Sequence, residues 1–492
     1  MLSFSPVSSH YKWLVFSVVS LGSLMQVFHH IGINVALPTI AQHFGVSLTI
    51  VQWVVLGESL TISALLLPMG RLSDIIGRRT IYMLGISLFG IMAFLAGSSP
   101  WIATALGLQS PIMLMISLKI VQGIGASMSQ ATGLAMVTSS FTKNERGKGL
   151  GAHASVIAVG AVGGPIIAGL LITYLNWQWF FWINVPLSGI TLIFAFFILN
   201  RVESLPSPDE ESSFDWVGAA LSAIVLLTFL LVLSNTGQLG WAHPYILLGS
   251  LLFITTLILF SWWELRYSSP MLDLRLFRDK LLSVGISTNY FSFFGSSAFT
   301  FLIPFYLQAV LKLNPAQVSY VLIPNAVTRV ILGPLSGNLS DRYGRKIFAT
   351  SGLAICGIGL CMMGFMGIST PLWYVIISII IFGSGFGIFM SPNNATIFRG
   401  SSESKHGVAS ALVSLSRNAG NITGIAVATA IVAATMYAGG YSTDVESVIT
   451  AKTNSGLLEF FIIGMKIVYF FVGTVQIGSS VAHLLVKNPI DQ

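Results

Sequence analysis

One acidic residue of this chain, Glu58, lies deep within a long apolar stretch, whereas the rest of its seventeen Asp and Glu residues fall in loops or near expected helix ends. A charge in the middle of a membrane helix costs at least about 2.5–3.5 kcal/mol, so it should face a cavity or a partner. Burial also favours the neutral form of a carboxyl, which suits a proton carrier. We therefore expect Glu58 to handle protons or cations, with a permanent pair to Arg, Lys or His as the alternative.

Two adjacent histidines, His29 and His30, lie in a second apolar stretch. Imidazole titrates near neutral pH, so both are candidates for proton coupling, although a histidine in such a place can also be a hydrogen-bonded core residue. Ser23, Gln26, His30 and Asn34 follow spacings of three, four and four. This spacing predicts one polar face of a helix, which we expect to line a cavity.

Basic residues within apolar stretches are Lys119, Arg329, Arg417 and Lys466. Arg329 follows Asn325 by one helical turn, and Arg417 shares a polar stripe with three small polar residues, Ser410, Ser414 and Asn421. Each Arg could bind a ligand or hold helices together, and Lys466 could extend toward the membrane surface. A further polar face, Asn289, Ser292, Ser296 and Thr300, lies in a Phe-rich stretch that would suit amphiphilic molecules or face lipid.

Long apolar segments must position these side chains. The chain is 54% hydrophobic and 8% charged, whereas soluble domains carry roughly 25% charged residues. A bilayer core takes about 20 apolar residues per helix, and we predict an all-α integral membrane protein with fourteen spans. They are placed at about 13–37, 48–69, 80–97, 108–138, 148–173, 178–199, 215–234, 244–264, 282–308, 317–335, 347–367, 371–396, 405–436 and 457–486. Cys356 and Cys361 fall in one span and are expected to pack rather than to form a disulfide or a metal site.

A short basic loop occurs twice. Residues 70–80 read GRLSDIIGRRT and residues 337–347 read GNLSDRYGRKI, an offset of 267 residues. The shared positions predict two related halves, as in many secondary transporters. The copies lie eight spans apart rather than six, so two extra helices should separate two six-helix bundles. We expect bundles at 1–200 and 282–492, with 201–281 forming an acidic cytoplasmic loop (201–214) and a two-helix linker.

Basic residues are distributed unevenly between the two sides of these spans. Eighteen lie on the side that holds the N-terminus, and only Lys312 and Lys452 lie on the other. Lys and Arg concentrate in cytoplasmic loops, which predicts a multi-pass protein of the cell membrane with both termini in the cytoplasm. The same rule explains the net charge of +7 without a nucleic-acid partner.

At these residues the chain resembles the major facilitator superfamily and, more narrowly, its fourteen-helix drug:proton antiporters of the multidrug efflux type. The gating-loop motif of that family is matched at Gly70, Asp74, Gly77, Arg78 and Arg79, and again at Gly337, Asp341, Arg342, Gly344 and Arg345. Its antiporter motif is matched at Gly151, Gly160, Gly164, Pro165 and Gly169. Physically, an Asp at such a loop can cap a helix or pair with Arg in one state, and small residues with a proline permit close packing and a bend.

Three residues depart from the family pattern in the first half. His29 stands where the family usually has an Asp, Glu58 where it has a Tyr, and Lys119 where it has an Arg. The segment Lys119-Ile-Val-Gln122-Gly123 otherwise resembles the family's proton-coupling motif. The resemblance therefore implies that His29, His30 or Glu58 replaces the missing Asp, with Lys119, Gln122 and Arg417 as further candidates for coupling or for the cavity.

No P-loop, zinc spacing, haem motif or nucleophile elbow occurs, so neither an enzyme nor an ATP-driven pump has support from the sequence. We expect alternating-access export of hydrophobic or cationic small molecules, driven by a proton gradient without a cofactor, by a monomer in the lipid bilayer. The alternatives are a proton-linked exporter of one metabolite or organic anion, such as a siderophore, which the three inward basic residues make credible, and a non-transporting membrane sensor.

Overall fold

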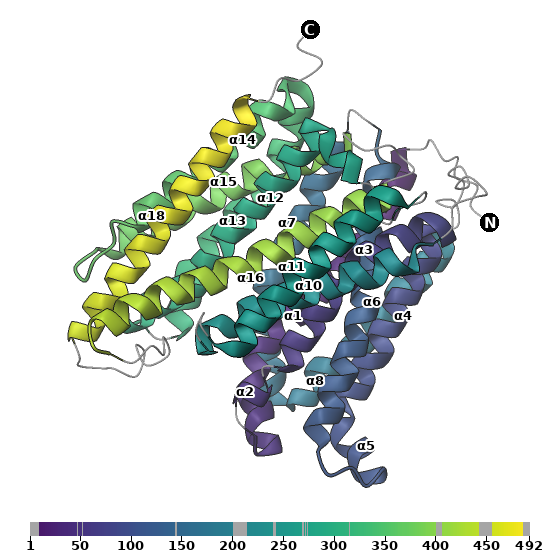
Figure 1. Cartoon of the computed structure of the whole chain (residues 1–492), viewed down its shortest axis with the longest axis horizontal. Helices are drawn as coiled ribbons and strands as arrows, with labels where there is room; N and C mark the ends of the chain where they lie inside the picture. Colours follow the sequence, from purple (N-terminus) through teal and green to yellow (C-terminus); the bar gives the residue numbers. More distant parts are fainter. Residues whose placement is uncertain are drawn as a thin grey trace. The chain divides into compact units, whose positions relative to one another are not determined.

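The computed structural model describes residues 9–46, 48–51, 53–142, 145–199, 214–239, 243–267, 270, 272, 274–313, 315–399, 406–441 and 455–485. Within these ranges the chain is helical and contains no strand (Figure 1). The long helices are α1 (Ser9–Phe44), α3 (Trp53–Ile76), α4 (Arg78–Gly97), α6 (Pro111–Ser140), α7 (Arg146–Tyr174), α9 (Asn184–Ile198), α10 (Trp216–Leu239), α11 (Pro244–Arg266), α12 (Lys280–Phe305), α13 (Pro315–Tyr343), α14 (Arg345–Met363), α15 (Leu372–Arg399), α16 (His406–Ala438) and α18 (Ser455–Leu485). Short helices are α2 (Leu48–Val51), α5 (Ser99–Ala105), α8 (Trp177–Trp182), the 3₁₀ turn Leu274–Arg278 and a π turn at Tyr306–Val310.

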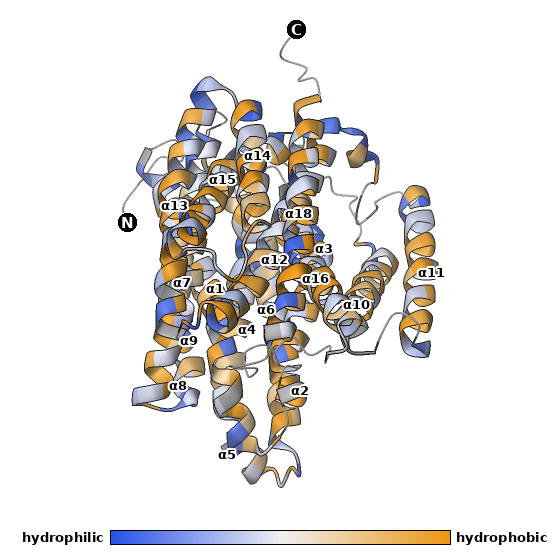
Figure 2. Cartoon of the chain, turned by 90° about the vertical axis from the view of Figure 1, so that its left-hand side faces the viewer, coloured by the Kyte–Doolittle hydropathy of each residue, from blue (hydrophilic) through white to orange (hydrophobic). Residues whose placement is uncertain are grey.

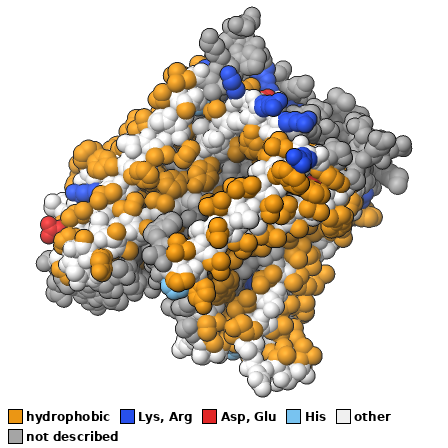
Figure 3. Space-filling view, viewed as in Figure 1, with side chains coloured by type: hydrophobic (Ala, Val, Ile, Leu, Met, Phe, Trp, Pro, Cys, Tyr) orange, Lys and Arg blue, Asp and Glu red, His pale blue; other side chains and the backbone are white. Residues whose placement is uncertain are grey.

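Twelve segments of the described chain are long and apolar enough to cross a membrane. Figure 2 shows hydrophobic residues along the full length of many helices, and the face in Figure 3 is dominated by hydrophobic side chains with few charged ones. Helices α10 and α13 coincide with two further expected spans but are not among the twelve. The prediction of an all-helical membrane protein is thus confirmed, whereas the count of fourteen spans stays a prediction. The acidic loop lies, up to residue 213, outside the described residues.

The chain divides into two compact units, which we describe separately. The first comprises residues 1–227, 256–274 and 401–415 and contains α1, α3, α4, α6, α7 and α9. Helix α6 packs against α1, α3 and α4, and α1 also packs against α7 and α9. The helices that carry the candidate residues of this unit therefore pack around α6 and α1.

Glycines set the closest helix contacts in this unit. A Cβ on Gly164 of α7 would lie 2.7 Å from the carbonyl oxygen of Phe28 on α1, and a Cβ on Gly32 would lie 2.8 Å from the carbonyl oxygen of Gly164. The same reciprocal contact joins α4 to α6 at Gly85 and Gly125. Small residues therefore let backbones touch, and in the predicted antiporter motif this role falls to Gly164, whereas Gly169 has no atom within 4 Å of its would-be Cβ.

The second unit comprises residues 228–255, 275–400 and 416–492, and its main contacts join α14 to α15 and α18, and α15 to α13. Gly352 of α14 and Gly385 of α15 repeat the reciprocal contact, because each would place a Cβ within 3 Å of the other's carbonyl oxygen. Gly352 follows Gly85 by the same 267 residues that separate the two loop motifs. The internal repeat therefore extends from the loops into the helix packing.

The α1–α7 contact can be tested with neighbouring glycines. We expect Gly164→Ala to lower the thermal unfolding temperature of the purified protein by several degrees, because the added methyl group meets backbone atoms that cannot move aside, and overpacking costs about 1–3 kcal/mol. Gly163→Ala is the matched control, since nothing lies within 4 Å of its would-be Cβ. Equal unfolding temperatures for the two variants would contradict this account.

Candidate functional site

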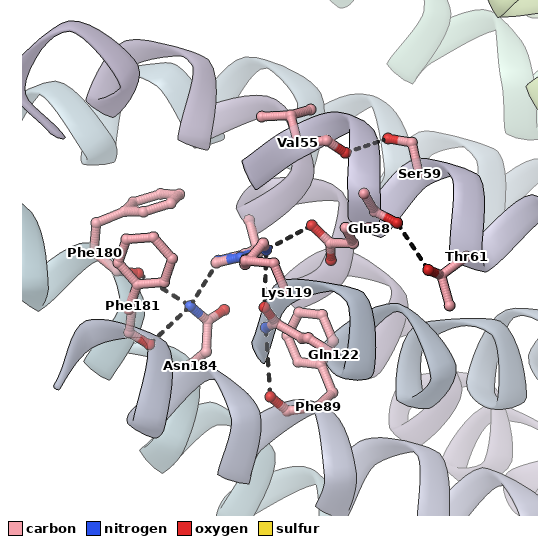
Figure 4. Close-up of polar contacts among 12 residues, drawn as sticks. Val55, Glu58, Ser59, Thr61, Phe89, Lys119, Gln122, Phe180, Phe181 and Asn184 are labelled. Atoms are coloured by element: carbon pink, nitrogen blue, oxygen red, sulfur yellow. Dashed lines mark hydrogen bonds and ion pairs between the residues drawn. The ribbon is translucent and has the colours of Figure 1, made fainter. Parts of the chain in front are cut away.

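The buried Glu58 has a buried partner. Its Oε2 lies 2.6 Å from the Nζ of Lys119, and the two side chains are 2% and 0% exposed (Figure 4). The pair joins α3 to α6 within the first unit. A buried ion pair loses several kcal/mol of hydration for each charge, and removal of one partner leaves the other charge uncompensated. Of the two interpretations of Glu58 offered by the sequence, the structure shows a pairing with Lys, and this pairing leaves a proton-carrying role open.

The Nζ of Lys119 has three close polar partners. Besides Glu58, its Nζ lies 2.7 Å from Nε2 of His29 on α1 and donates to Oε1 of Gln122 at 2.8 Å. Gln122 in turn donates to the carbonyl oxygen of Phe89. The departures from the family pattern at His29, Glu58 and Lys119 therefore form a single cluster, with the predicted residue Gln122 as its fourth member.

A fifth member, Asn184 at the start of α9, was not identified from the sequence. Its Nδ2 lies 3.0 Å from Nδ1 of His29 and donates to the carbonyl oxygens of Phe180 and Phe181. The ring of Phe180 stacks on His29 with centroids 5.1 Å apart. Asn184 thus ties the imidazole to the α8–α9 junction and fixes its orientation. The signal lay at 179–186, WFFWINVP, where Asn184 stands among aromatic and apolar residues.

Other candidates on α1 lie apart from this cluster. Gln26 is buried and donates to Ser129 on α6, and Asn34 is exposed and donates to the carbonyl oxygen of Ile31 on its own helix. The expected polar face of this helix is therefore not a uniform cavity lining, and the histidine that turns inward is His29.

Candidates in the second unit form separate polar contacts. Asn289 and Ser292 on α12 are 0% exposed, and Asn289 donates to Ser416 on α16 at 2.6 Å. Ser296, on the same face, accepts a hydrogen bond from Arg329, and Arg329 also donates to Asn325. Arg417 lies on α16. The predicted polar face of α12 is thus buried at Asn289, Ser292 and Ser296 and reaches both α13 and α16, whereas Thr300 is exposed.

The two loop motifs adopt the same structure. Gly77 and Gly344 have φ of 109° and 102°, a conformation that residues with a Cβ rarely adopt. One residue later, Arg78 and Arg345 return to Asp74 and Asp341, with Nη2–Oδ1 distances of 3.0 and 2.9 Å. The predicted Asp–Arg pairing is therefore present in both copies, between residues four apart.

The first copy also makes a contact to a distant segment of its own unit. Oδ2 of Asp74 accepts a hydrogen bond from the backbone N–H of Val408, in the first turn of α16, at 3.3 Å. A carboxylate near a helix N-terminus is favourable because it faces unpaired N–H groups. This arrangement fits the expected role of an Asp that caps a helix, while Gly70, Arg79, Gly337 and Arg342 lie in the same two helix-end segments.

Sequence comparison identifies the family. The sequence profile of the Major Facilitator Superfamily matches residues 19–425. The chain belongs to the major facilitator superfamily. Riboflavin transporter RibZ of Clostridioides difficile (strain 630) is 32% identical over 413 residues, which cover 83% of this chain and 85% of the relative. Multidrug resistance protein Stp of Mycobacterium tuberculosis (strain CDC 1551 / Oshkosh) is 28% identical over 422 residues, covering 86% and 76%.

Solved structures support the same fold. The proton:xylose symporter XylE, bound to 6-bromo-6-deoxy-D-glucose, matches with a TM-score of 0.64 at 14% identity and covers 96% of this chain and 95% of its own. This likeness concerns the fold alone. This member of the superfamily is therefore an all-helical membrane transporter. The family and the fold do not identify its substrate or its energy source.

The ion pair leads to a prediction on stability. We expect Lys119→Met to lower the unfolding free energy by about 3–5 kcal/mol, because it leaves the Glu58 carboxylate buried without a partner. The double variant Glu58→Gln/Lys119→Met should recover most of this loss, which a double-mutant cycle of thermal unfolding would measure.

The exposed ion pair between Lys12 and Glu145 is the control. Its side chains are 17% and 40% exposed, and the hydrogen bond from Lys12 lowers the pKa of the Glu145 carboxyl. A lowered folded-state pKa means that this small contribution is present above the unfolded value and is lost as the pH falls through the folded one. Lys12→Ala should change stability by no more than about 1 kcal/mol. An equally small effect of Lys119→Met would contradict a buried ion pair.

Proposed function

We propose that this protein is a proton-coupled antiporter that exports hydrophobic small molecules by alternating access. The observation that carries the proposal is the cluster of Glu58, Lys119 and His29, which places a titratable carboxylate on a buried ammonium beside an imidazole. Intramembrane ionisable residues of this kind mark proton and substrate pathways. A multidrug resistance protein and a methylenomycin A resistance protein among the relatives support efflux.

The cluster suggests how a proton could shift the conformation. Protonation of Glu58 would cancel the charge opposite Lys119, while His29 and Gln122 would still hold the ammonium. A buried cation without a counter-charge is unfavourable, so the protonated state would favour a conformation in which water or substrate reaches Lys119. Release of the proton would restore the ion pair and the present packing.

A specific metabolite is the second candidate substrate. The relative named as a riboflavin transporter matches over most of both chains. This similarity supports a single substrate rather than a broad range of drugs. The charge of Lys119 also counts against a cationic substrate at this site, because its single carboxylate neighbour is already paired. We therefore place hydrophobic compounds and one metabolite ahead of cationic drugs.

The finer features of the architecture belong to the same proposal. We propose the fourteen-helix drug:proton antiporter type, with α10 and α11 as the inserted pair and α13 as a span. Both termini would lie in the cytoplasm, on the side rich in Lys and Arg. The protein would work as a monomer in the cell membrane, with the proton gradient in place of a cofactor.

Proton coupling can be tested in liposomes that contain the purified protein. An imposed pH gradient should drive chloramphenicol, which is uncharged, or riboflavin across the membrane, and the internal pH should change in the same experiment. The Glu58→Gln variant should show a gradient-driven flux at least about tenfold lower than that of the wild type, because an amide cannot take up a proton. Glu459→Gln is the matched control, since it removes an exposed glutamate from α18 in the other unit.

Two outcomes would refute the proposal. Flux without proton movement would exclude antiport, and an unchanged pH dependence in Glu58→Gln would remove this carboxyl from the mechanism. Thermal unfolding of the variants would show whether a loss of flux reflects a loss of folded protein.

A further inference from the structure

A second charge within an apolar helix, the half-buried Arg329, lies at the middle of α13, fourteen residues from each end of this helix. At 1.5 Å per residue, roughly 21 Å of helix separates it from either end. This depth excludes contact with lipid headgroups. Unlike Lys119, which is 0% exposed, Arg329 keeps part of its surface accessible.

Close helix packing brings Arg329 against α15. A Cβ on Gly387 would lie 3.2 Å from the Cα of Arg329, and a Cβ on Gly383 would lie 2.6 Å from Oδ1 of Asn325. The two glycines lie one turn apart, so α13 approaches α15 along one strip. Arg329 is thereby placed over the side chains that α15 presents beside that strip.

Those side chains are aromatic rings that lie buried beneath the guanidinium, since Phe382 is 0% and Phe386 5% exposed. The guanidinium carbon of Arg329 lies 3.9 Å from the ring centroid of Phe386 and 5.4 Å from that of Phe382. The rings are braced from α12 by Phe293, which packs on Phe386, and Phe299, which packs on Phe382. Stacking on aromatic rings orients the guanidinium plane and leaves its edge for hydrogen bonds.

Only some of the N–H groups on that edge of the guanidinium donate hydrogen bonds. Nε of Arg329 donates to Oδ1 of Asn325 at 3.1 Å, and Nη2 donates to Oγ of Ser296 at 3.3 Å. Both acceptors are neutral. A guanidinium has five N–H groups, so three of them have no acceptor among the described residues.

No carboxylate of the described part of this unit is placed to compensate the charge. Its acids are Asp279, Asp341 and Glu459. Asp279 caps α12, Asp341 pairs with Arg345, and Glu459 lies exposed near the start of α18. The internal repeat shows where an acid would be expected. Asn325 follows Glu58 by 267 residues, so the second unit carries an amide at the position where the first carries its buried carboxylate.

We infer that Arg329, with Asn325 and Ser296, binds the acidic group of an organic anion, while the rings of Phe386 and Phe382 hold the guanidinium in place. This inference rests on the proposed transport function and names the substrate class. A carboxylate, sulfonate or phosphate would accept the N–H groups that the protein leaves unused, and it would supply the charge that this unit lacks. Charge-assisted hydrogen bonds of this kind are about twice as strong as neutral ones.

The test is equilibrium binding to the purified full-length protein in nanodiscs of neutral phosphatidylcholine. The probes are tritiated 2-naphthoate and 2-naphthamide, which share their rings and differ in charge. The wild type should bind the anion about tenfold or more tightly, as expected for a hydrogen-bonded charge. Arg329→Gln should bring the two affinities to about the same value.

A second variant guards against misfolding. Asn325→Asp keeps the size of the side chain and places a carboxylate 3.1 Å from Nε of Arg329, so it should abolish the anion preference by occupying the guanidinium. Lys466→Gln is the matched control, because it removes a positive charge from a different helix of the same unit, α18. It should keep the wild-type preference.

The results separate this inference from the transport proposal because binding needs no pH gradient. Absence of 2-naphthoate binding, equal affinities for the two probes in the wild type, or an anion preference that survives both Arg329→Gln and Asn325→Asp would refute the anion site. Arg329-dependent binding without proton movement in liposomes would refute only antiport.

Discussion

The position of Lys119 in an apolar helix bundle is the constraint on which the first unit depends. An ammonium that is 0% exposed must find acceptors for all three hydrogens and a counter-charge, and it finds them on α1, α3 and its own helix. These contacts fix the rotation of α1 and α3 about their axes, since a turn of either helix would leave a charge unpaired at a cost of several kcal/mol. The glycine contacts between α1 and α7 and between α4 and α6 bring the backbones close enough for these side chains to meet.

Much of this could be predicted from sequence because the determining features were local. The helices follow from apolar length, and the two loops follow from a motif whose Gly77 and Gly344 must adopt positive φ. Glu58, His29 and Lys119 stood out because each is an ionisable or basic residue in apolar sequence. What sequence could not give was which of them touch, because that depends on helix rotation and on packing between distant segments.

Asn184 and Asn34 illustrate the difference. Asn184 follows an aromatic run and carries no charge, so only the three-dimensional contact with His29 marks it as part of the cluster. Asn34 belongs to a regular polar spacing on α1, yet its side chain is exposed and bonds to its own helix. Periodicity identifies a face, but the neighbours of that face decide whether it is buried.

The two units repeat the same helix packing but differ in where they carry charged side chains. The repeat places Glu58 and Asn325 at matching positions, and it also matches Ile62 with Arg329. The first unit therefore holds an acid whose basic partner comes from α6, whereas the second holds a base whose nearest acceptors are neutral. Backbone packing requires small residues at fixed offsets, so it preserves the repeat, but it places no demand on which side chain fills position 58 or 325. This freedom allows one unit to carry a self-contained ion pair and the other a cation that donates hydrogen bonds to the neutral side chains of Asn325 and Ser296.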